Sequence, residues 1–216
     1  MNTSTPTLAQ VLTQARTLGL ERIDAQMLLL HAMGRPDAGR AWLLAHDTDA
    51  LEPAVQEAFM ALCQRRAAGE PVAYLTGRKE FYGLPLVIDA RVLDPRPDTE
   101  TLVDWALEVI APLASPRVVD LGTGSGAIAL ALQSQRTDAQ VLAVDASADA
   151  LAVARANAER LGLPVQFQPA NWLAGVEGPF DAIVSNPPYI PSADPHLAAL
   201  THEPLQALAS GADGLE

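Results

Sequence analysis

From Arg117 onward the chain alternates short apolar stretches with helical ones, and this alternation constrains the fold more than any other feature. The predicted strands cover residues 118–121, 141–144, 165–167 and 180–184. The predicted helices between them cover residues 127–132 and, after a capping Ser147, residues 148–161. Strands that alternate with helices form a parallel sheet through right-handed crossovers. We therefore expect a Rossmann-like α/β fold with helices on both faces of the sheet.

The first 75 residues carry a helical pattern instead. Helices are expected near Leu8, after Asp24, after Asp37 and from Pro53, since proline suits the first turn of a helix. Two short strands around a glycine then predict a β-hairpin. We expect a helical-bundle domain over 1–75, a β-hairpin linker over 76–92 and the sheet domain over 93–216.

The charge of the chain is unevenly distributed. The whole sequence has 26 acidic and 14 basic side chains and a net charge of -12. Residues 1–86 carry 9 acidic and 8 basic side chains, whereas residues 87–216 carry 17 acidic and 6 basic ones. Because affinity for nucleic acid comes mainly from basic residues, we expect no direct nucleic-acid partner.

Cys63 is the single cysteine, which excludes an internal disulfide and a cysteine-rich zinc site. It falls on the apolar face of the helix that begins at Pro53, so we expect it to pack rather than react. The sequence has no run of about 18 apolar residues and no signal-peptide pattern. We therefore expect a cytoplasmic monomer with neither a membrane partner nor a bound metal.

A glycine-rich turn joins the first predicted strand to the next helix. It covers residues 120–127, with Gly122, Gly124 and Gly126 at alternate positions. Glycines at this point let a ligand approach the backbone closely. Asp145 closes the second strand, where a carboxylate can accept hydrogen bonds from both ribose hydroxyls of an adenosine. The pattern fits an adenosine-containing cofactor without choosing which one, NAD included, and a strand–helix turn that merely needs small residues is the competing interpretation.

The fourth predicted strand runs into the tetrapeptide Asn186-Pro187-Pro188-Tyr189. Ligands of open parallel sheets bind at the carboxyl ends of the strands, so this motif should face the glycine turn. The prolines stiffen the turn and remove backbone donors. The Asn186 side-chain oxygen and the Pro187 carbonyl oxygen are then two acceptors beside the Tyr189 ring, an arrangement that suits a planar NH2 group.

A planar NH2 group held in this way can accept a methyl group. Asn186 and Pro187 would each accept one N–H, which orients the nitrogen, so catalysis would be mostly positioning and electrostatics. With S-adenosyl-L-methionine as donor, the predicted reaction is an SN2 transfer that leaves S-adenosyl-L-homocysteine. The competing interpretation is a purely structural Pro-Pro turn after a strand.

Together these motifs resemble the class I S-adenosylmethionine-dependent methyltransferases that act on NH2 nitrogens. Residues 71–77 (PVAYLTG), 95–100 (PRPDTE) and 190–197 extend the resemblance to the peptide-chain-release-factor glutamine N5-methyltransferases, the PrmC/HemK family. The resemblance covers essentially the whole chain. It implies methylation of the glutamine in the Gly-Gly-Gln loop of class I release factors, which tunes translation termination. It also implies that the helical domain recognises this protein substrate.

The resemblance also assigns the residues of the site. The catalytic residues are Asn186, Pro187 and Tyr189. The substrate-binding residues are Asn186, Pro187, Pro188, Tyr189 and Arg96. The cofactor-binding residues are Gly122, Thr123, Gly124, Ser125, Gly126, Asp145, Trp172 and Asn186.

Two positions depart from the family pattern. Asn171 stands where an acidic residue is usual, and Asp94 where an aliphatic residue is frequent. We expect Asn171 still to form a hydrogen bond with an adenine. Arg96 has an alternative structural role, a salt bridge with Glu100, and His196 is interpreted as part of the loop structure rather than as a base.

Three other functions stay open. An adenine-N6 DNA or RNA methyltransferase would share the motif at residues 186–189, because a flipped-out adenine also offers an NH2 group. The acidic sheet domain counts against it. A NAD-dependent dehydrogenase would leave that motif unexplained. A non-catalytic cofactor-binding protein would not need both Asn186 and Asp145.

Sheets of this class of methyltransferase normally have more strands than the four predicted here. We expect the family pattern to continue beyond residue 216 and interpret the chain as C-terminally truncated. The fourth strand would then lie at an exposed sheet edge. If the chain is the whole product, we expect weak stability and poor turnover.

Overall fold

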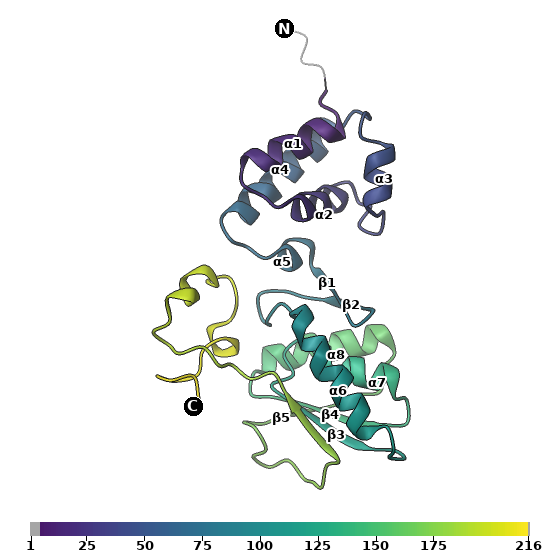
Figure 1. Cartoon of the computed structure of the whole chain (residues 1–216), viewed down its shortest axis with the longest axis vertical. Helices are drawn as coiled ribbons and strands as arrows, with labels where there is room; N and C mark the ends of the chain where they lie inside the picture. The colour runs from purple at the N-terminus through teal and green to yellow at the C-terminus, as the bar shows by residue number, and fades with distance from the viewer. Residues whose placement is uncertain (1–4, 216) are drawn as a thin grey trace. The chain divides into compact units, whose positions relative to one another are not determined.

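The computed structural model describes residues 5–215 (Figure 1). These residues divide into two compact units, with the boundary between Thr76 and Gly77. Residues 1–4, where the predicted helical domain begins, and Glu216 lie outside the described residues. Within the described part, no helix has the length and apolar character needed to cross a membrane.

The first unit is a bundle of short helices around one apolar core. Phe59, Cys63 and Leu28 are fully buried in this core. The packing role predicted for Cys63 is therefore confirmed, and burial raises the pKa of its thiol to about 11. The helices are α1 (Leu8–Thr17), α2 (Arg22–Ala32), α3 (Arg40–Ala45), α4 (Pro53–Ala67) and α5 (Val72–Thr76).

Local capping explains where these helices begin. Pro53 occupies the first turn of α4, as predicted. The prediction that Asp24 caps α2 is wrong, because Glu21 is the N-cap and Asp24 lies within the first turn. There its carboxylate accepts a 2.7 Å hydrogen bond from Nε of Arg66 on α4. Asp24 thus ties two helices together, a role that only the tertiary structure reveals.

A β-hairpin opens the second unit. Strands β1 (Arg78–Phe81) and β2 (Leu84–Val87) pair antiparallel, with Phe81 opposite Leu84. The two-residue turn contains Tyr82 and Gly83, both with positive φ, of 52° and 77°. Positive φ at both central residues is typical of the tight turn that matches the twist of a hairpin.

The main sheet has the strand order β5-β4-β3-β6, and all its neighbours are parallel. The strand β3 lies in the interior, and β6 lies at one edge, as predicted. The strands are β3 (Arg117–Leu121), β4 (Gln140–Asp145), β5 (Gln166–Pro169) and β6 (Ala182–Ser185).

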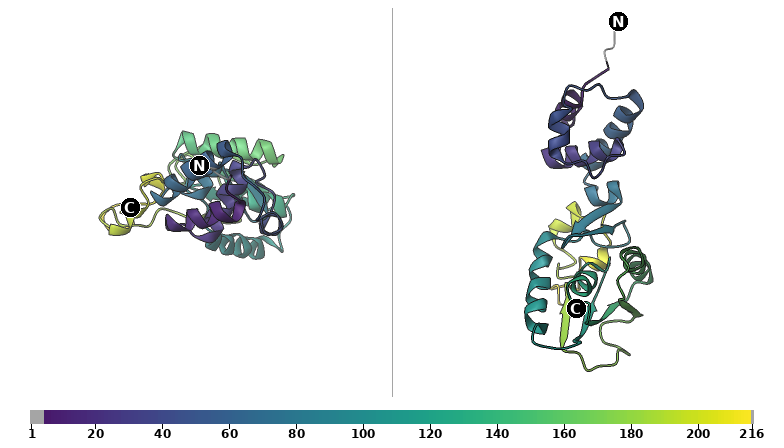
Figure 2. Two further views of the ribbon diagram at one scale, coloured as in Figure 1. Left: turned by 90° about the horizontal axis from the view of Figure 1, so that it is seen from above. Right: turned by 90° about the vertical axis from the view of Figure 1, so that its right-hand side faces the viewer.

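Three helices, α6 (Glu100–Ile110), α7 (Ala127–Gln135) and α8 (Ala148–Leu161), lie side by side on one face of this sheet (Figures 1 and 2). The crossovers through α7 and α8 both step across the sheet in the same direction, from β3 to β4 to β5. Right-handed crossovers in one direction place their helices on one face. The expected helices on both faces are therefore not found among the described residues.

The opposite face of the sheet packs against a loop. Val119, Leu121 and Val144 are buried there, with Val176 and Phe180 of the loop packed against them. Ile183 of the edge strand β6 remains 54% exposed. The apolar side chains of the sheet are thus well covered near β3 and less covered at the β6 edge.

Two glycines with the same backbone conformation allow a test of how tightly α7 and α8 pack. Gly126 has φ +85°, and a Cβ there would lie 3.1 Å from Leu130 Cδ1 and 3.2 Å from Ala154 Cβ. Gly162, which ends α8, has φ +67° and open space around a Cβ.

We predict that Gly126→Ala lowers the free energy of unfolding by about 3 kcal/mol, from backbone strain plus overpacking. Gly162→Ala, the matched control, should cost about 1 kcal/mol, because it adds only the backbone strain. Urea denaturation measures both values. Equal costs for the two variants would contradict the close packing of the two helices.

Candidate active site

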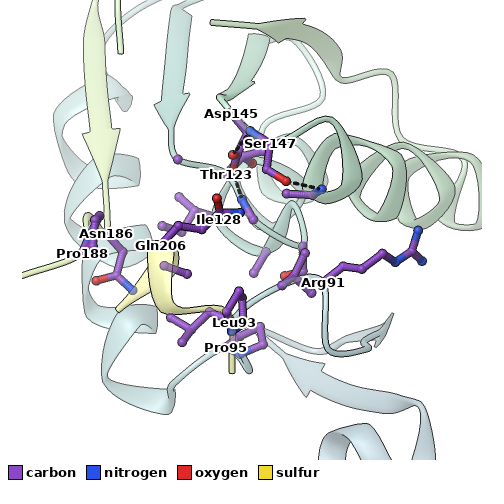
Figure 3. A pocket seen from close by; sticks show the side chains of 18 of the residues that line it. Arg91, Leu93, Pro95, Thr123, Ile128, Asp145, Ser147, Asn186, Pro188 and Gln206 are labelled. Carbon is purple, nitrogen blue, oxygen red and sulfur yellow. Dashed lines mark hydrogen bonds between the residues drawn. The ribbon is translucent and has the colours of Figure 1, made fainter. Parts of the chain in front are cut away.

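A pocket lies at the carboxyl edge of the sheet, where β3, β4 and β6 end (Figure 3). In Figure 3, Asp145 and Thr123 lie on one side, with Leu93 and Pro95 opposite. Its lining comes from segments after the three strands and from two loops that are distant in the sequence. The lining residues are Arg91, Val92, Leu93, Pro95, Thr99, Gly122, Thr123, Gly124, Ser125, Ala127, Ile128, Asp145, Ser147, Ala150, Asn186, Pro188, Pro204, Gln206 and Ala207.

The glycine loop between β3 and α7 forms one wall. Gly122 and Gly124 have positive φ, of 71° and 55°, and a Cβ built on either residue would meet no described atom within 4 Å apart from those of its chain neighbours. The amides of Gly122 and Thr123 both donate to the Val144 carbonyl oxygen, at 2.8 and 3.0 Å. The loop is therefore fixed against β4 while its glycines leave room for a ligand beside the backbone.

Asp145 holds the glycine loop and the start of α8 together. One carboxylate oxygen accepts from the Gly124 amide at 2.9 Å and the other from the Ser147 amide at 2.8 Å. Ser147 caps α8 as predicted, its hydroxyl oxygen accepting from the Ala150 amide at 3.2 Å. Each carboxylate oxygen keeps a second lone pair, so Asp145 can still accept hydrogen bonds from the hydroxyls of a ribose.

Asp120, at the carboxyl end of β3, supports the loop from below and is fully buried. Its Oδ2 accepts a 2.7 Å hydrogen bond from the Thr123 hydroxyl. Burial raises the pKa of Asp120 to about 6, against the lowering effect of the Thr123 hydrogen bond. Desolvation dominates because the carboxyl is fully buried, and burial disfavours its charged form.

The motif at residues 186–189 begins where β6 ends. Its position is fixed on one side by Ser185, whose hydroxyl donates to the Leu121 carbonyl oxygen at 2.8 Å. Asn186 and Pro188 line the pocket (Figure 3). Pro187 and Tyr189 do not, and the Tyr189 side chain is 69% exposed. The sheet thus brings Asn186 to the same cavity as the glycine loop and leaves Tyr189 open to solvent.

Downstream of the motif, the chain is held by its last described segment. The Ile190 amide donates to the Leu208 carbonyl oxygen at 3.0 Å, and the Ser210 amide donates to the Ile190 carbonyl oxygen at 3.1 Å. This parallel bridge connects the motif to the segment that contributes Pro204, Gln206 and Ala207 to the pocket.

Arg96 does not line the pocket, and its predicted salt bridge with Glu100 is not formed. Its Nη2 instead lies 2.5 Å from Glu203 Oε1, and its Nη1 lies 3.8 Å from Asp94 Oδ2. Glu100 accepts a 2.9 Å hydrogen bond from the Tyr82 amide of the hairpin turn. Glu203 lies 107 residues after Arg96, a separation at which sequence spacing gives no pairing signal.

Two other predicted residues lie away from the lining. Trp172 follows β5 in a loop, is 46% exposed and has a positive φ of 53°. Asn171 before it is also exposed. His196 lies in a short 3-10 helix, with Nδ1 2.7 Å from Asp194 Oδ1. The carboxylate occupies one ring nitrogen of this exposed histidine, which agrees with its interpretation as loop structure.

Sequence reasoning missed a whole wall of the pocket. Pro204, Gln206 and Ala207 line it, yet the stretch has no apolar periodicity or glycine pattern to mark it. The wall with Leu93 and Pro95 had one usable signal, since the prolines at 95 and 97 predict a rigid turn. Among residues 5–215, no cluster of three or more His, Cys, Asp or Glu residues could hold a metal ion.

Two family models match this chain. The model described as "Methyltransferase small domain" matches residues 98–210, and the "PrmC N-terminal domain" model matches residues 7–77. The first match spans the glycine loop, Asp145 and the motif at residues 186–189.

Proteins named "Release factor glutamine methyltransferase" are similar to this chain over most of its length. The one from Bordetella pertussis is 51% identical and covers 91% of this chain and 73% of the relative. The one from Burkholderia pseudomallei is 46% identical over 100% of this chain and 78% of the relative. The Escherichia coli relative is 42% identical over 96% and 75%.

A solved structure is similar in fold alone. The catalytic domain of hMettl16, in complex with MAT2A 3'UTR hairpin 6, has a TM-score of 0.50 and 19% sequence identity. The likeness covers 70% of this chain and 58% of that one.

Because Asp120 is buried, its contribution to the free energy of unfolding should depend on pH. Its pKa of about 6 lies above the ordinary value of 3.8, so the folded state binds this proton more tightly than the unfolded state. The contribution therefore falls as the pH rises through the window from 3.8 to about 6. Asp120→Asn stays neutral and keeps an oxygen that can accept from the Thr123 hydroxyl.

We predict that the stability of Asp120→Asn relative to the wild type rises by up to about 3 kcal/mol between pH 4 and pH 8. Asp138→Asn should show no such trend over this range, because the hydrogen bond from Arg136 lowers the pKa of Asp138 from 3.8 to about 2 and so confines its pH-dependent contribution to lower pH. Urea denaturation at several pH values measures both variants. A pH-independent difference for Asp120→Asn would contradict the desolvated carboxyl.

Proposed function

This chain belongs to the release factor glutamine methyltransferase family, and on that premise we propose that it methylates the side-chain amide of a glutamine in peptide-chain release factors. The finer proposal is that the methyl acceptor is N5 of the glutamine in the Gly-Gly-Gln motif of class I release factors. The methyl donor is S-adenosyl-L-methionine, and the product is S-adenosyl-L-homocysteine.

One observation carries the proposal: Asn186 and the glycine loop line a single pocket. The parallel pairing of β3 with β6 sets Leu121 opposite Ser185, so the two loops leave the sheet side by side. One loop supplies a cradle of small residues, and the other supplies amide and carbonyl acceptors. A cofactor on the first loop and an NH2 group on the second would meet in the space between them.

The residues at the carboxyl ends of β3 and β4 fit the cofactor. Gly122 and Gly124 leave open space beside their backbone, which suits the close approach of the methionine part. Asp145 retains lone pairs for the ribose hydroxyls, and the Gly124 and Ser147 amides hold it in place. When bound, S-adenosylmethionine supplies an electrophilic methyl group on its sulfonium sulfur. Trp172 keeps its proposed role beside the adenine.

The residues after β6 orient the acceptor nitrogen. The Asn186 side-chain oxygen and the Pro187 carbonyl oxygen each accept one N–H of the glutamine amide. This holds the nitrogen in a fixed orientation, and its weak nucleophilicity is offset by positioning rather than by a strong base. Pro188 and the exposed Tyr189 ring flank the amide, and after transfer the nitrogen releases its extra proton to solvent.

We propose that the protein acts as a cytoplasmic monomer and that the helical unit recognises the release factor. Residues 87–216 carry 17 acidic and 6 basic side chains, which supports a protein substrate rather than a phosphate backbone. An adenine-N6 methyltransferase, which shares the motif at residues 186–189, is disfavoured by the same charge.

Mass spectrometry tests the proposal directly. Release factor is incubated with this protein and S-adenosylmethionine, and peptides are searched for an added methyl group. We expect one methyl on the glutamine of the Gly-Gly-Gln loop. A release factor with that glutamine changed to alanine is the control, and continued methylation of it would overturn the proposed acceptor.

Asn186→Ala tests the mechanism. Removing one acceptor of the glutamine amide should lower kcat by about 10²- to 10³-fold, the usual cost of losing one preorganised polar group. Asn186→Asp replaces the amide oxygen with a carboxylate oxygen that can still accept, so kcat should fall less. Steady-state kinetics measures kcat. Calorimetry with S-adenosylhomocysteine, the demethylated form of the cofactor, checks that the variants still bind it. Unchanged kcat for Asn186→Ala would contradict the role assigned to this side chain.

A further inference from the structure

Four charged side chains form a compact network beside the pocket. Arg96 Nη2 lies 2.5 Å from Glu203 Oε1, and Arg96 Nη1 lies 3.8 Å from Asp94 Oδ2. Lys79 Nζ lies 3.2 Å from Asp94 Oδ1. The network contains two carboxylates and two cations. Each carboxylate has a cationic partner, Lys79 for Asp94 and Arg96 for Glu203.

Glu203 is the most deeply buried member of this network. Its side chain is 2% exposed, whereas that of Arg96 is 41% exposed. Both carboxylate oxygens are engaged, since Oε1 receives the Arg96 guanidinium and Oε2 accepts from the Asp94 amide at 3.3 Å. A buried carboxylate that loses its partner carries an uncompensated charge, which strongly favours rearrangement of the segment around it.

The network joins two walls of the pocket. Pro95, which precedes Arg96, lines one wall, and Pro204, which follows Glu203, lines the other. Proline fixes the backbone φ angle, so the position of each charged residue is transmitted to the lining residue next to it. The ion pair therefore links these two walls across 107 residues of sequence.

The segment that follows Glu203 is also hydrogen-bonded to the chain directly after the proposed acceptor motif. The wall segment after Pro204 continues to Leu208 and Ser210, which exchange backbone hydrogen bonds with Ile190 just after the motif at residues 186–189. A shift of Glu203 would thus move both the lining of the pocket and the support of the motif.

We propose that the Arg96–Glu203 ion pair is a clamp that positions the walls 92–95 and 204–207 around the cofactor. The inference rests on the proposed function for the identity of the ligand. Arg96 and Glu203 are positioning residues here: they act through their proline neighbours and do not touch the reacting atoms. Asp94 extends the clamp to Lys79 and the hairpin, which gives this aspartate a structural role.

Hydrogen exchange on the ligand-free protein tests the clamp without any cofactor. Glu203→Gln preserves shape and removes the charge. We expect backbone amides of residues 204–211 to exchange about tenfold faster in this variant, while amides of β3 are unchanged, because only the clamped segment opens locally. Unchanged exchange in residues 204–211 would overturn the clamp.

Binding of S-adenosylhomocysteine supplies the second readout. We expect its dissociation constant to rise about tenfold in Glu203→Gln and in Arg96→Met, because the looser pocket must be ordered before it binds. Arg96→Lys should rescue part of the loss, since it keeps the charge but cannot reach both carboxylates.

Asp138→Asn is the matched control, because it removes an ion pair of the same unit away from the pocket. Arg136 Nε lies 2.9 Å from Asp138 Oδ1, and neither residue lines the pocket. This variant should lower the melting temperature without changing the dissociation constant. Equal weakening in the control would overturn the clamp in favour of a general loss of stability.

Binding and exchange together distinguish a wrong clamp from a wrong proposed function. If the wild type does not bind S-adenosylhomocysteine while Glu203→Gln still exchanges faster, the proposed function is contradicted and the coupling of the walls stands. If the wild type binds and the variants bind equally well, the clamp is contradicted and the proposed function stands.

Discussion

The parallel pairing of β3 with strands on both of its sides is the constraint on which the site depends. Leu121 lies opposite Val144 on one side and opposite Ser185 on the other, so three strands end at the same edge. The glycine loop, Asp145 and Asn186 follow directly from these ends. No long-range side-chain contact is needed to bring them together, because the backbone register does so.

Hydrogen-bonded carboxylates, two of them buried, give the edge its rigidity. Asp145 is held by two backbone amides, Asp120 by the Thr123 hydroxyl, and Glu203 by Arg96 and the Asp94 amide. Charged or strongly polar acceptors in a low-dielectric setting fix the geometry of their donors. The surplus of acidic residues in this unit is therefore partly structural, since some of its carboxylates hold the loops that form the pocket.

Local sequence patterns predicted the features that depend on local physics. The four strands, the Ser147 cap, the Pro53 helix start and the position of Asp145 all follow from periodicity and capping rules, and the structure has them. The partners of Arg96 and Asp24 could not be predicted, because each lies on a segment distant in sequence. The wall at residues 204–207 was missed for the same reason: its place is set by long-range backbone pairing and one ion pair. The expectation of helices on both faces of the sheet was wrong, because both described crossovers step across the sheet in one direction.

A crystal structure of this chain with S-adenosylhomocysteine tests most directly whether the shared carboxyl edge is the active site. We predict ligand density between the glycine loop and Asn186, with the ribose hydroxyls on the Asp145 carboxylate and Pro95 and Pro204 on the two sides. Ligand bound elsewhere on the molecule, with this pocket unchanged, would contradict the assignment of the site.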